Sequence, residues 1–78
     1  MGKAYLTLNK LPQGKCACVR TLFADEEVKR RLEDLGLVTG TKVEAVQKSR
    51  SGDPTAYYFR GTVIALRSEQ ARQILVEV

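Results

Sequence analysis

The stretch Arg31–Thr41, which reads RLEDLGLVTGT, joins the one clear helix of this 78-residue chain to its main run of strands. Leu32 and Leu35 share a helix face with the preceding Val28, at the i, i+4, i+7 spacing that predicts an amphipathic helix packed on a core. Gly36 follows at once, and glycine reaches the left-handed backbone angles that often end a helix. The stretch therefore predicts a short helix that stops abruptly, an apolar elbow and the first residues of a sheet.

The predicted helix covers about residues 26–35. Asp25 can accept a hydrogen bond from an unpaired amide of the first turn, and Glu26 and Glu27 lie near the positive end of the helix dipole. Three acids in a row could also attract a hard cation, but the capping role explains them and is the preferred interpretation. A helix of about ten residues is marginal alone in water, so burial of its apolar face must stabilise it. We therefore expect Leu35→Ala to lower the free energy of unfolding by about 2–5 kcal/mol.

The rest of the chain alternates in the manner of short strands separated by turns. A polar loop contains Gly52-Asp53-Pro54 and predicts a hairpin, while Ser68 is expected to cap a short helical turn near 68–73. An open sheet of this size leaves costly edges unless it curls. We therefore predict a mainly β fold, a small SH3-like antiparallel barrel of five to six strands with one inserted amphipathic helix. The predicted strands are residues 15–22, 42–48, 55–60, 62–66 and 74–78, with 5–8 as a short edge strand.

The strand at 15–22 has two credible core faces. One face carries Ala17 and Val19, together with a small threonine. The other carries the two cysteines and Leu22, but it must also accommodate Arg20. The alternation alone does not decide which of these two faces points into the core.

Length, composition and charge exclude several classes of protein. A chain of 78 residues with mixed charges and ordinary apolar content forms one folded domain, 1–78. The net charge is +4, but no block of five like charges exists, so we expect no nucleic-acid partner. We expect a cytoplasmic protein without membrane insertion, because no apolar run or signal-peptide core is long enough. The absence of histidine removes the commonest general base and metal ligand, and we expect no enzyme.

The Cys16-Ala17-Cys18 segment is the one candidate metal site. On a strand its two thiols point the same way and could hold part of a soft metal site. Zinc usually takes four ligands, however, and the chain has no other cysteine and no histidine. The preferred interpretation is therefore that both residues are packed, reduced and without a disulfide. We expect no cofactor, and weak ferrous or other transition-metal binding at Cys16 and Cys18 is the alternative.

A partner-binding surface is the remaining source of function. Tyr57 and Phe59 are expected in the core, so Tyr58 should face solvent. Exposed tyrosine and arginine are enriched at the energetic centres of interfaces, and Leu37, just beyond the helix, is expected to leave apolar area uncovered. The predicted partner-binding residues are therefore Leu37, Arg50, Tyr58 and Arg60. The alternative is that Leu37 is buried and the arginines are merely solvated.

Several motifs together resemble one known family. The segment 30–41 has the pattern Arg-Arg-Leu-x-x-Leu-Gly-Leu-Val-x-Gly-Thr, and Gly52-Asp53-Pro54 and the run 60–67 follow in order. This arrangement resembles the FeoA family, the small cytoplasmic proteins of bacterial ferrous iron transport, from about residue 8 to 78. The resemblance departs at Thr39, where the family often has proline, and at Tyr58, in an outward position that is often charged.

The resemblance implies an SH3-like barrel that supports, by protein–protein contact, the cytoplasmic part of a FeoB-type ferrous iron transporter. Related domains are fused to iron- or manganese-dependent repressors, which makes a stand-alone SH3-like regulatory module the alternative. This chain has no helix-turn-helix of its own, which argues against a complete repressor. A third hypothesis is a small barrel that binds peptide or RNA.

Overall fold

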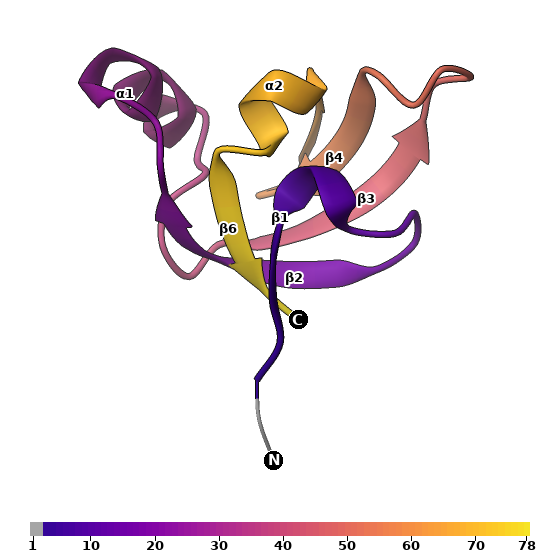
Figure 1. The fold of residues 1–78 in the computed structure, drawn as a ribbon, viewed down its shortest axis with the longest axis horizontal. Helices are drawn as coiled ribbons and strands as arrows, with labels where there is room; N and C mark the ends of the chain where they lie inside the picture. Colours follow the sequence, from indigo (N-terminus) through magenta and orange to yellow (C-terminus); the bar gives the residue numbers. More distant parts are fainter. Residues whose placement is uncertain (1–2) are drawn as a thin grey trace.

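The computed structural model describes residues 3–78, in which six antiparallel strands form one curled sheet (Figure 1). The strand order is β1-β6-β2-β3-β4-β5, so β1 and β5 are its two edges. The elements are β1 (Tyr5–Thr7), a 3₁₀ turn η1 (Leu8–Lys10), β2 (Cys16–Leu22), α1 (Glu26–Asp34), β3 (Lys42–Lys48), β4 (Thr55–Phe59), β5 (Thr62–Leu66), α2 (Ser68–Ala71) and β6 (Ile74–Glu77). The predicted mainly β fold with one inserted helix is confirmed.

Two short helical segments cover the open side of the curled sheet. Figure 1 shows α2 and η1 next to each other, between β6 and β4. Leu8 of η1 and Leu11, the residue that follows this turn, are fully buried, and Ala71 of α2 is 1% exposed. The sheet has a barrel-like, SH3-like form, and side chains from these segments complete its core.

The inward face of β2 carries Ala17, Val19 and Leu22. A register shift between Val19 and Thr21 in the pairing of β2 with β6 inserts an extra residue, so Leu22 turns inward despite the alternation. The two cysteines are exposed, and the preferred interpretation that they are packed is therefore wrong. A single-residue bulge cannot be read from the alternation, because it depends on the partner strand.

The N-terminus of α1 is capped as predicted, since the Asp25 carboxylate accepts a hydrogen bond from the Val28 amide at 3.0 Å. Leu32 is the buried residue of this helix, at 1% exposure. Leu35 is 39% exposed, so its predicted place in the core is wrong. It lies at the C-cap of α1, where the helix has ended and the chain turns, so Leu35 does not continue the buried face of the helix.

The elbow after α1 places Leu37 in the core instead. Gly36 has φ +107°, which reverses the chain direction, and Leu37 is then fully buried. Thr41 holds the turn closed, because its hydroxyl donates to the Gly36 carbonyl at 2.8 Å. The predicted exposure of Leu37 on a partner surface is therefore wrong, and the alternative that it is buried is confirmed.

Two hairpins complete the sheet. In the β3–β4 loop, the Asp53 carboxylate accepts a hydrogen bond from the Ser68 amide at 2.8 Å. Ser68 was expected to cap the helical turn, but it is the first residue of α2 and Arg67 is the N-cap residue. Asp53 from this distant loop binds the Ser68 amide, and the Gln70 side chain accepts a hydrogen bond from the Arg67 amide at 3.0 Å. The β4–β5 hairpin turns through Arg60 and Gly61, with φ of 52° and 80°. These paired left-handed angles suit a tight two-residue turn.

Candidate partner-binding surface

The convex side of the sheet carries one contiguous group of exposed side chains, which we call the outer face. The strand register aligns Cys16 with Glu44, Glu44 with Tyr58, and Tyr58 with Val63. Residues directly opposite on adjacent antiparallel strands lie within side-chain contact distance. A second row begins with Cys18 opposite Lys42. The outer face consists of Cys16, Cys18, Lys42, Glu44, Tyr58, Arg60 and Val63.

A hollow of about 330 Å³ lies in the outer face, and Tyr58 forms part of its wall. Tyr58 is 46% exposed, as predicted from the alternation of β4. Its neighbours Tyr57 and Phe59 are each 1% exposed and form part of the core. The residues that line the hollow are Cys16, Lys42, Glu44, Tyr58, Phe59, Arg60 and Gly61.

Lys42 and Arg60 separate this hollow from a second one that lies beside the elbow. The second hollow is formed by the chain from Val38 to Lys42, together with Arg60. Both basic side chains line both hollows, so a ligand in either one meets two positive charges. Within residues 3–78, neither basic side chain forms an ion pair.

The Arg60 side chain lies across Gly36. A Cβ atom added at Gly36 would approach the Arg60 Cδ to 2.8 Å, which is closer than packed atoms allow. The glycine that ends α1 thus also provides the space in which Arg60 rests. This contact joins the elbow to the outer face and limits the directions in which the guanidinium can point.

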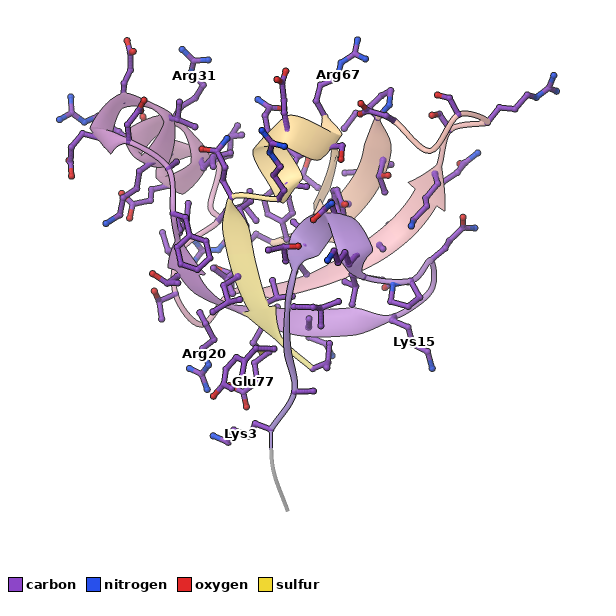
Figure 2. All side chains as sticks on the ribbon, in the orientation of Figure 1. Lys3, Lys15, Arg20, Arg31, Arg67 and Glu77 are labelled. Atoms are coloured by element: carbon purple, nitrogen blue, oxygen red, sulfur yellow. The ribbon has the colours of Figure 1, made fainter. Side chains whose placement is uncertain are left out.

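The ion pairs found among residues 3–78 lie at another part of the sheet surface. Figure 2 shows Lys3, Arg20 and Glu77 close together near the N-terminal segment. The Arg20 Nε donates to the Glu77 carboxylate, and this hydrogen bond lowers the pKa of Glu77 below its ordinary value of 4.5. The same contact raises the pKa of Arg20. These charges compensate one another, whereas Lys42 and Arg60 form no ion pair within residues 3–78, although Glu44 lines the same hollow.

The structure brings together two of the four predicted partner-binding residues. Tyr58 and Arg60 line the same hollow. Arg50 lies in the loop before β4, and Arg60 lies in the turn after it. The five residues of β4 separate them by roughly 17 Å. Leu37 belongs to the core and is not part of the surface.

Lys42 was missed as a site residue. The sequence feature that could have identified it is its position at the start of the predicted strand 42–48, on the face opposite Val43 and Ala45. The alternation alone indicates an exposed lysine, which is ordinary. Only the pairing of β3 with its neighbours brings it beside Arg60 and Cys18.

Residues 3–78 contain neither a metal-binding cluster of three ligands nor a membrane-spanning helix. In residues 3–78, no three Cys, Asp or Glu side chains come together in a group that could hold a metal ion. Cys16 and Cys18 nevertheless lie exposed on the same face of β2. No helix in that part of the chain is long and apolar enough to cross a membrane.

Comparisons with known proteins identify similar sequences and structures. Residues 6–78 match the FeoA domain family. The chain is 35% identical to a FeoA-like protein from Clostridium acetobutylicum, with a TM-score of 0.88 over 100% of this chain and 90% of that one. It is 34% identical to a FeoA protein from Chlorobium tepidum, with a TM-score of 0.87 over 94% of this chain and 70% of that one.

A third similar structure is FeoA of Stenotrophomonas maltophilia complexed with zinc, which is described as a prokaryotic SH3 domain protein. It is 33% identical, with a TM-score of 0.81 over 91% of this chain and 88% of that one. A manganese-dependent transcriptional repressor shares the fold over 97% of this chain and 42% of that one, at 16% identity and a TM-score of 0.84. A search of curated protein sequences found no match.

Proposed function

The chain belongs to the FeoA family, and on that premise we propose that it is a cytoplasmic accessory protein that binds the cytoplasmic part of a FeoB-type ferrous iron transporter. The observation that carries this proposal is the hollow in the outer face, where exposed Tyr58 adjoins Lys42 and Arg60. The family is one of small accessory SH3-like proteins associated with iron transport, not a known family of enzymes.

The chemistry of the hollow suits a protein partner. A tyrosine side chain supplies a large rigid contact area, and arginine supplies several fixed donors, so both types are enriched where binding energy concentrates. Arg60 is partly held in place by its packing across Gly36, which reduces the conformational entropy lost on binding. The two positive charges favour a partner segment that carries a carboxylate.

The role is contact, not catalysis. The chain has no histidine, and a hydroxyl or thiol nucleophile needs an adjacent base. Carboxylates and amines remain, but Lys42 and Glu44 lie on an open, solvated face. General acid–base groups usually need burial or a strongly perturbing neighbour to work near neutral pH.

Binding to the transporter tests the proposal directly. The cytoplasmic part of the ferrous iron transporter from the same organism is immobilised, and binding of this protein is measured with and without guanine nucleotide. We expect binding that Tyr58→Ala and Arg60→Glu each weaken roughly tenfold or more, because each removes a central contact. Absence of binding in every nucleotide state would overturn the proposal.

A matched control separates local contacts from net charge. Arg72 follows α2 on the other side of the sheet and is exposed, so Arg72→Glu makes the same change in charge as Arg60→Glu away from the outer face. We expect Arg72→Glu to change binding less than twofold. Equal losses from both variants would indicate a long-range charge effect instead of a docking site.

The fold shared with a manganese-dependent repressor favours one alternative, a regulatory module that serves a DNA-binding partner. At 16% identity the similarity concerns the fold alone. This alternative predicts capture of a metal-dependent DNA-binding protein and no binding to the transporter. RNA binding by this protein that weakens steeply with rising salt concentration would instead support the nucleic-acid hypothesis, because counterion release dominates such binding.

A further inference from the structure

Cys16 and Cys18 form a pair of exposed thiols that the proposed function does not use. Both are free and lie on the outer face, while the intervening Ala17 is 5% exposed and points into the core. Each of the three residues pairs in unbroken register with β3, as Cys16 with Glu44, Ala17 with Val43 and Cys18 with Lys42. The two side chains therefore lie next to each other on a regular stretch of strand.

The spacing of the pair prevents it from closing into a disulfide. Same-face neighbours on a strand are about 6.8 Å apart, whereas disulfide-bonded Cβ atoms must approach to about 3.5–4.5 Å. Each Sγ would have to move about 2.4 Å along the strand to form a bond of about 2.0 Å, which is more than one carbon–sulfur bond can reach. The regular pairing of β2 with β3 resists the distortion that would be needed. The two thiols are therefore not expected to form a disulfide with each other.

The same spacing accommodates one metal ion between the two sulfurs. With sulfur–metal bonds of about 2.3 Å, a linear thiolate–metal–thiolate unit spans about 4.6 Å. Each Sγ then needs to lean only about 1 Å toward the other, which a side-chain rotation provides. A bridge by one ion fits where a direct sulfur–sulfur bond does not.

The available ligands select the kind of ion. No third Cys, Asp or Glu joins the pair in a group within residues 3–78, so a four-coordinate zinc site is not complete in one chain. Hard divalent cations prefer several oxygen ligands. Soft thiolates select ions such as Cu(I), and two such ligands in line are sufficient for a two-coordinate ion.

We propose that Cys16 and Cys18 bind one soft monovalent metal ion of the cuprous type per chain. On binding, both thiols release a proton to solvent and each sulfur donates an electron pair to the metal, with no change in oxidation state. The bis-thiolate unit then carries one net negative charge. Lys42, directly opposite Cys18, offsets that charge, and it also faces the negative charge of Glu44, which lies opposite Cys16.

The surroundings place this site at the border of the proposed docking hollow. Cys16 lines the hollow, whereas Cys18 lies in the next row, between Lys42 on β3 and Glu77 on β6. The Glu77 carboxylate is already engaged by Arg20 and Lys3. The site does not depend on transporter binding, so its test stands apart from that of the proposed function.

A competition titration tests the site. The reduced protein is titrated anaerobically with Cu(I) against a chromophoric Cu(I) chelator, and the amount of metal transferred is measured. We expect one ion per chain, and Cys16→Ser and Cys18→Ser should each weaken affinity by about 10²–10⁴-fold, because the second thiolate binds intramolecularly. If either single-cysteine variant retained wild-type affinity, one thiol alone would be the ligand, and the proposal would be overturned.

A double variant provides the matched control for spacing. Cys18→Ser combined with Arg20→Cys retains two exposed thiols on β2 but separates them by about 13 Å, too far for one ion to bridge. We expect it to bind no more tightly than Cys18→Ser alone, with a cooperative melting transition as evidence of folding, slightly below the wild type because the Arg20–Glu77 pair is lost. Tight Cu(I) binding by the double variant would contradict a site within one chain. Binding of one ion per two wild-type chains, with dimer formation, would contradict it as well.

Discussion

The elbow (Leu35–Thr41) and the outer face differ in how closely their surroundings constrain them. In the elbow, Leu37 is fully buried, and the Thr41 hydroxyl and a left-handed glycine hold the turn closed. On the outer face, two basic side chains and two free thiols lie exposed with no ion pair or disulfide among the described residues. The elbow stabilises the fold, whereas the outer face leaves aromatic, basic and thiol groups exposed, which is why we propose it as the functional surface.

Arg60 connects these two regions. Its stem packs over Gly36 in the elbow, while its guanidinium borders both hollows of the outer face. A glycine motif that ends a helix therefore also orients a binding residue far along the chain. Variants that separate stability from binding can test how independent the two regions are.

The largest effect is expected in the elbow. Leu37→Ala should lower the free energy of unfolding by about 2–5 kcal/mol, because it leaves a cavity in the core. Leu35→Ala should lower it by less than about 1 kcal/mol, since this side chain is 39% exposed. Urea denaturation of both variants measures the difference. Equal losses would mean that Leu35 is part of the core after all.

A smaller loss is expected where the elbow meets the outer face. Gly36→Ala should destabilise by about 1–3 kcal/mol, because φ is +107° and the new methyl group meets Arg60. Gly40→Ala is the control, since its φ is +95° but its Cβ position is open. Adding Arg60→Ala to Gly36→Ala should recover the excess over the control in urea denaturation. No recovery would show that the steric contact is unimportant.

Charge reversal on the outer face should change binding and not stability. We expect Lys42→Glu to weaken transporter binding about tenfold, or about 1.4 kcal/mol, while unfolding changes by less than about 0.5 kcal/mol. Arg50→Glu should weaken binding less than twofold, because the β4 strand separates this loop residue from the hollow. Isothermal titration calorimetry gives both values. A larger loss of binding from Arg50→Glu than from Lys42→Glu would indicate that the contact surface lies at the β3–β4 loop.

The smallest effect is expected at the compensated charges. The pKa of Glu77 is lowered in the fold by its hydrogen bond from Arg20, so its stabilising contribution is fully present above the ordinary value of 4.5. The contribution shrinks as the pH falls below that value and disappears once the pH passes the lowered pKa. Glu77→Gln should therefore melt slightly below the wild type at pH 7 and together with it at pH 2. A constant difference across this range would rule out ionisation as the cause.

Local sequence patterns predicted most elements of the fold. The cap at Asp25, the helix stop at Gly36 and the core positions of Tyr57 and Phe59 all follow from interactions within a few residues. The exposure of Tyr58 follows from the same strand alternation. The candidate site was predicted only in part, because Tyr58 and Arg60 were identified while Lys42 was not.

The errors have two physical origins. Leu35 and Leu37 are both apolar residues beside a glycine, and the local turn at Gly36, which Thr41 closes, decides which of them reaches the core. The inward position of Leu22 on β2 depends instead on a bulge against β6, a contact with a segment distant in the sequence.

The sequence by itself determined the start and end of α1 to within a residue, the alternation of the strands, the hairpin turns and the family, because backbone preferences and glycine angles act over short ranges. Only the tertiary structure decided that the thiol pair faces solvent, that Asp53 binds the Ser68 amide, and that Lys42 lies beside Arg60. These neighbours arise from strand register, and register is fixed by how all the strands pack together on one core.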